Sequence, residues 1–126
     1  MTFHFLISLG IACLILTAIV HSIGGEKYLL RPLFTHRGNH VLNHNLGRMV
    51  LRFAWHITSV FWLLLAAILY TSAFYETYLV TFVLWSVGAT FAAVGVFDLF
   101  ASRGRHIGWP LLVLTGIFIL AATAYK

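Results

Sequence analysis

Four long runs of apolar residues constrain the fold of this 126-residue sequence more than any other feature. A helix that crosses the hydrocarbon core of a bilayer needs about 20 mostly apolar residues in a row. The runs that meet this length lie near residues 3–25, 50–72, 78–101 and 107–125. The chain is 61% hydrophobic and only 9% charged, whereas a soluble domain of this size needs a charged surface. The sequence therefore predicts an all-α integral membrane protein.

The connections between these runs predict an antiparallel, up-down bundle of four transmembrane helices in one domain, residues 1–126. The turns near residues 73–77 and 102–106 are short, and short turns place neighbouring helices side by side. The 26–49 connection is longer, and the Gly24–Gly25 pair before it predicts the end of the first helix. In the third run, small residues recur at helical spacing and predict a face for close helix packing: Gly88, Ala92 and Gly95.

Basic residues gather at one end of the predicted bundle. Of the eight lysines and arginines, all but Lys126 lie in or beside the 26–49 and 102–106 connections. Such an excess marks the cytoplasmic side, so we expect a multi-pass protein of the plasma (inner) membrane with both termini on the non-cytoplasmic side. The net charge of +5 then orients the chain and contacts anionic lipid headgroups. No stacking or groove-reading motif indicates a nucleic-acid partner.

Ionisable side chains gather at the same end. One comes from each predicted helix: His21, His56, Asp98 and His106. Glu26 follows His21 by five residues, and Arg52 precedes His56 by about one helical turn, on the same stripe of the second helix. An ionisable group at membrane depth costs several kcal/mol unless it is paired. We therefore predict a polar site at the cytoplasmic end of the bundle.

The first interpretation of this site is a metal centre with His21, His56 and His106 as ligands. Three neutral imidazoles suit zinc, iron(II) or copper. Asp98 or Glu26 would complete the coordination or orient a ligand histidine. No local signature such as HExxH accompanies these residues, so this prediction depends on how the helices bring them together.

A haem and a proton pathway are two further interpretations. For a haem, two histidines would be axial ligands, and Arg52 and Arg105 would pair with the propionates. A proton-linked transporter of small solutes would use histidine because this side chain titrates near neutral pH. Both lack partners in the outer half of the predicted bundle, where His4 stands alone. There is no nucleophile–base triad, phosphate loop or dinucleotide fingerprint, so an enzyme would need a bound metal or cofactor.

A structural interpretation competes with these three. Each histidine would bind its own carbonyl, hydroxyl or carboxylate across neighbouring helices, and Asp98 would pair with Arg103 or Arg105. The chain would then be a non-enzymatic membrane subunit. A bundle this small suits one subunit of a homo-oligomer or of a larger membrane complex. In the shared-site interpretations, Arg52 is expected to meet Glu26, Asp98 or a bound anion.

A second histidine pattern lies in the long connection, where the spacing is i, i+4 and i+8: His36, His40 and His44. On a helix these residues would share one face, as at a surface metal site. However, Gly38 and the neighbouring asparagines weaken a helix. A solvated loop is therefore the expectation here, with a surface metal site as the alternative.

Overall fold

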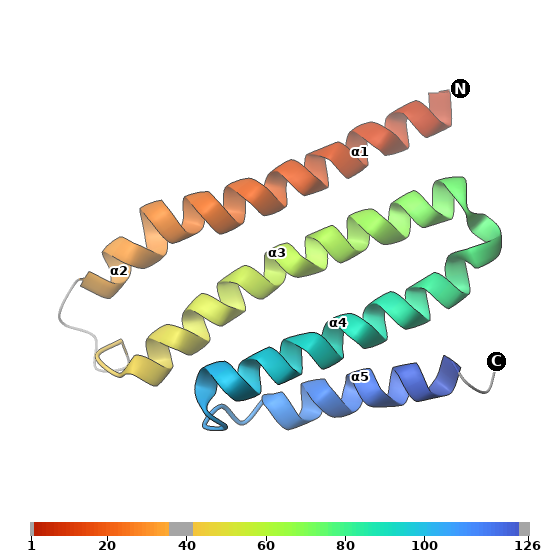
Figure 1. Cartoon of the computed structure of the whole chain (residues 1–126). Helices are drawn as coiled ribbons and strands as arrows, with labels where there is room; N and C mark the ends of the chain where they lie inside the picture. Colours follow the sequence, from red (N-terminus) through yellow and green to blue (C-terminus); the bar gives the residue numbers. More distant parts are fainter. Residues whose placement is uncertain (1, 36–41, 124–126) are drawn as a thin grey trace.

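The computed structural model describes residues 2–35 and 42–123, and this part of the chain is all-helical (Figure 1). Its four main helices are α1 (Thr2–Ile19), α3 (Asn45–Phe74), α4 (Leu79–Ser102) and α5 (Trp109–Thr123). Three short elements continue α1 without a break: η1 (Val20–Gly24), η2 (Glu26–Leu30) and α2 (Arg31–Thr35). A 3₁₀ turn, η3 (Glu76–Tyr78), joins α3 to α4. The predicted all-α fold is confirmed.

Three helical segments are long and apolar enough to cross a membrane: Thr2–Thr35, Asn45–Phe74 and Glu76–Ser102. α5 is equally apolar, but its 15 described residues span only about 22 Å at 1.5 Å per residue. The hydrocarbon core of a bilayer is about 30 Å thick. Length and composition therefore agree with a membrane protein for three helices, and a fourth crossing by α5 stays a prediction.

The main helices lie in one row instead of closing around a common core. α1 packs on α3, α3 on α4 and α4 on α5, and each helix runs antiparallel to its neighbour (Figure 1). α1 and α5 form the two edges of the row, and the described chain ends lie at the same end of it (Figure 1). The up-down order thus agrees with the sequence prediction, whereas the closed bundle is not found among the described helices.

Glycines allow the closest contact in the row, which joins α4 to α5. A Cβ atom placed on Gly95 would lie 2.6 Å from the backbone nitrogen of Val113. One placed on Gly116 would lie 2.4 Å from the backbone nitrogen of Ala92. Small residues permit such close backbone approach between membrane helices. The predicted small-residue face, which includes Gly88, is confirmed, and it packs against α5.

The first helical segment does not end at Gly24–Gly25, contrary to the sequence prediction. Gly25 has helical dihedral angles (φ −61°, ψ −43°), and the chain continues through two π-helical turns into α2. Glycine ends a helix when it adopts the left-handed conformation, and Gly25 does not. The second π turn ends at Leu30, two residues before Pro32. A proline ring clashes with the carbonyl four residues earlier in an α-helix, and a wider turn relieves that crowding.

Candidate functional site

The π-helical turns direct two consecutive polar residues, His21 and Ser22 of η1, toward α3. Nδ1 of His21 lies 3.1 Å from Oγ of Ser59. Oγ of Ser22 lies 2.6 Å from Nδ1 of His56. A π turn holds more residues than an α turn, and such turns recur at functional sites. It allows neighbouring residues of one segment to hydrogen-bond to the same facing helix.

Glu26 joins cationic and titratable side chains from both segments. Its Oε2 accepts a hydrogen bond from Nε of Arg52 at 3.0 Å and lies 3.5 Å from Nε2 of His56. Its Oε1 accepts a hydrogen bond from Nε of Arg31 at 3.3 Å. The Glu26 side chain is 20% exposed and that of Arg52 is 46% exposed, so this network lies at the edge of the fold. Arg52 meets Glu26, one of its expected partners, and the contact ties η2 to α3.

Two tryptophans of α3 surround the imidazole of His21. The ring of Trp55 stacks on it, with centroids 4.2 Å apart and an interplanar angle of 4°, and Trp62 meets it edge-on at 4.8 Å. Nε1 of Trp55 also donates a hydrogen bond to the backbone carbonyl of His21 at 2.9 Å. Gly25 makes room for this contact, because a Cβ atom there would lie 2.2 Å from the same indole nitrogen. Gly25 therefore serves close packing.

His106 belongs to a separate contact beside α4. Its Nδ1 lies 2.5 Å from Oδ2 of Asp98, whose side chain is only 1% exposed. The other carboxylate oxygen, Oδ1, and the hydroxyl of Ser102 are buried without a hydrogen-bond partner in the described part of the chain. Asp98 therefore pairs with His106, and not with Arg103 or Arg105 as the structural interpretation expected.

The structure does not bring His106 to His21 and His56. His21 and His56 join η1 to α3, whereas His106 contacts Asp98 of α4. In the open row, α4 lies on the other side of α3 from α1 (Figure 1). Among residues 2–35 and 42–123, no group of three or more His, Cys, Asp or Glu side chains is arranged to hold a metal ion. The three histidines are expected to converge only if four helix ends surround a common axis, and helices in a row have no such axis. Metal and haem binding stay predictions.

The second histidine pattern falls largely outside the described residues. His36 and His40 lie there, whereas His44 precedes α3 with an extended backbone (φ −91°, ψ 133°) and is exposed. Its conformation agrees with the expected loop at this position. Arg105, a predicted partner of the shared site, is exposed beyond the end of α4.

Two residues of the observed contacts, Ser22 and Trp55, have no distinct signal in the sequence. A 3.6-residue period does not place Ser22 beside His21 on the face toward α3, because the wider π turn creates that alignment. In the sequence, Trp55 is an ordinary aromatic residue near a membrane interface.

No protein-family model matches the chain, and neither a curated protein nor a solved structure matches it. Its own side chains are therefore the basis for a function.

Proposed function

We propose that this protein is a non-enzymatic subunit of a larger membrane assembly and that its histidines hold neighbouring helices together. The observation that carries the proposal is their pairwise use. The pairs are His21 with Ser59, His56 with Ser22 and Glu26, and His106 with Asp98. The pairs of His21 and His56 join the first helical segment to α3, the pair of His106 joins α4 to the turn that follows it, and none requires a substrate or cofactor.

Hydrogen bonds of this kind are suited to fastening helices in a bilayer. Between membrane helices they contribute about 0.6 kcal/mol on average and up to about 1.7 kcal/mol. The larger effect is the cost that they avoid, because an unpaired ionisable group at membrane depth costs several kcal/mol. In this proposal, Glu26 with His56 holds η2 against α3, and Asp98 with His106 holds the α4–α5 turn against α4.

The open row favours partners in the membrane. α1 and α5 are edge helices, and large apolar side chains are exposed on both, such as Leu16 and Phe118. α1 also exposes small residues along one side: Gly10, Cys13 and Thr17. Lipid covers apolar surfaces, but small residues additionally permit close approach of another helix. In this proposal, the exposed side chains of α1 and α5 form the contacts with other membrane helices.

The proposal also includes the topology: the four main helices cross the membrane, and both termini lie on the non-cytoplasmic side. The described chain ends lie at one end of the row (Figure 1). The arginines of α2, of the first turns of α3 and of the α4–α5 turn belong to the opposite end: Arg31, Arg48, Arg52, Arg103 and Arg105. An excess of basic residues favours the cytoplasm for that end. This orientation requires α5 to cross the membrane despite its short described length.

Native mass spectrometry after mild extraction tests the proposal. We expect a particle that contains this chain together with at least one further protein chain, and no haem or stoichiometric transition metal. Cys13 is the only cysteine and is exposed on α1, so oxidative crosslinking tests whether α1 contacts a second copy. The mass of the particle distinguishes a second copy from a different subunit, and a dimer band that Cys13→Ser removes shows that a second copy meets this chain through α1. A single chain as the only species, or a bound metal or haem, contradicts the proposal.

A further inference from the structure

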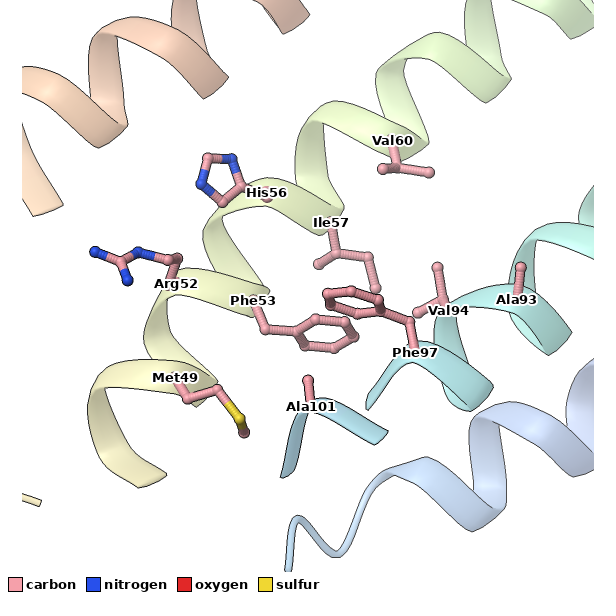
Figure 2. A pocket seen from close by; sticks show the side chains of 10 residues that line it. All are labelled: Met49, Arg52, Phe53, His56, Ile57, Val60, Ala93, Val94, Phe97 and Ala101. Atoms are coloured by element: carbon pink, nitrogen blue, oxygen red, sulfur yellow. The ribbon is translucent and has the colours of Figure 1, made fainter. Parts of the chain in front are cut away.

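A groove lies between α3 and α4 (Figure 2), and the stacked rings of Phe53 and Phe97, with centroids 5.9 Å apart, form part of its wall. Its volume is about 510 Å³, within the range of about 300–1,000 Å³ that small-molecule sites occupy. Its walls are mostly apolar and include Phe53, Ile57 and Val60 from α3 and Val94 and Phe97 from α4; Arg52 and His56 of α3 also line it. In a bilayer, a groove of this composition accepts hydrocarbon.

A polar hollow adjoins this groove at the basic end of the row. Its volume is about 340 Å³, and Asn45, Ser102, Arg103 and Arg105 line it. Met49 and Ala101 line both the hollow and the groove. The two spaces therefore adjoin, with a cationic hollow at the mouth of an apolar groove.

The cations of this mouth are available for a ligand. Arg103 and Arg105 are exposed, and neither forms an ion pair with an acidic side chain in the described part of the chain. In contrast, Arg31 and Arg52 are paired with Glu26. Arg103 also has left-handed dihedral angles (φ 52°, ψ 40°) at the end of α4, a position that favours glycine. An arginine there supplies a charge where glycine would fit the backbone better.

We propose that this site binds an anionic glycerophospholipid, with one acyl chain in the α3–α4 groove and the phosphate between Arg103 and Arg105. The order of the two spaces agrees with the depth profile of a lipid, because the mouth lies at the helix ends and the groove lies along the helices. Guanidinium groups bind phosphate oxygens through paired, charge-assisted hydrogen bonds. Basic pockets between membrane helices on the cytoplasmic side bind acidic lipid headgroups in this way. His56 also lines the groove, but its ring nitrogens face Ser22 and Glu26, so the proposal does not require a histidine to bind the lipid.

Lipid retention in native mass spectrometry tests this site. The full chain would be delipidated in detergent and incubated with mixed micelles of phosphatidylglycerol and phosphatidylcholine. We expect one tightly retained phosphatidylglycerol per chain. The double variant R103Q/R105Q should reduce that retention at least about tenfold, since loss of two charge-assisted contacts exceeds the 1.4 kcal/mol that corresponds to a factor of ten.

A matched control is K27Q/R31Q, which removes two charges from the same end of the row, away from the groove. It should retain the lipid as the wild type does, and an equal loss in both double variants overturns the proposal by showing non-specific charge attraction. Ala93→Phe places a large ring in the groove without changing charge, and it should also release the lipid. Undiminished retention by that variant, or displacement of the lipid by millimolar inorganic phosphate, overturns it as well. Circular dichroism melting of each variant confirms that its helices remain folded.

Discussion

Replacing Gly116 with alanine is expected to push α5 away from α4 and to lower the free energy of unfolding by about 2 kcal/mol or more. The added Cβ atom would lie 2.4 Å from the backbone nitrogen of Ala92 and 2.7 Å from its Cα and Cβ atoms. These neighbours belong to the backbone of α4 and have no rotamer that avoids the clash. Denaturant titration in mixed micelles measures the change.

Gly10→Ala is the matched control for this substitution. A Cβ atom at Gly10 would meet nothing within 4 Å, and alanine is favoured over glycine inside a helix by about 1 kcal/mol. The variant should therefore be as stable as the wild type or slightly more stable. Equal losses at Gly10 and Gly116 would show that the close α4–α5 contact is not what limits stability.

Replacing Asp98 with alanine is expected to lower the free energy of unfolding by about 2 kcal/mol, because it leaves Nδ1 of His106 without its hydrogen-bond partner. The Asp98 side chain is 1% exposed and that of His106 is 26% exposed, so solvent relieves only part of this cost. Asp98→Asn should lower the free energy of unfolding by less, since the amide oxygen still accepts a hydrogen bond from Nδ1 of His106. The same micelle titration compares the two variants.

The double variant D98L/H106L tests whether Asp98 and His106 stabilise the fold through their interaction or are only close in space. Replacement of both partners by apolar groups of similar size is often neutral or stabilising, whereas loss of one partner is costly. The double variant should therefore recover most of the stability that Asp98→Ala loses. If the double variant is less stable than either single variant, Asp98 and His106 do not act as a pair.

Residues with regular helical spacing could be predicted from the sequence, because their faces follow from local geometry. Gly88, Ala92 and Gly95 recur at intervals of about one turn, and they form the contact with α5. Likewise, antiparallel neighbours place His21 and His56 at the same contact between helices. The position of Arg52 one turn before His56 also agrees with its ion pair to Glu26.

The arrangement of the helices beyond nearest neighbours could not be predicted in this way. Short turns specify which helices are adjacent, but a row and a closed bundle satisfy the same turns. The sequence therefore predicts one site for His21, His56 and His106, whereas the row keeps His106 apart. The π turns have no signal in the sequence either, since they depend on contacts such as Gly25 with Trp55 and on the position of Pro32. The sequence alone does not show the contact of Gly25 with Trp55, and a glycine pair without a known tertiary contact predicts a helix end.

A double-mutant cycle between His56 and His106 tests most directly whether the histidines act in separate pairs or in one shared site. The free energy of unfolding would be measured in micelles for His56→Ala, His106→Ala and the double variant, with a cycle between His56 and Ser22 as the control for a direct contact. Separate pairs predict additivity between His56 and His106 within about 0.5 kcal/mol, and measurable coupling between His56 and Ser22. A coupling of about 1 kcal/mol or more between His56 and His106 would contradict the pairwise contacts and would indicate one shared site.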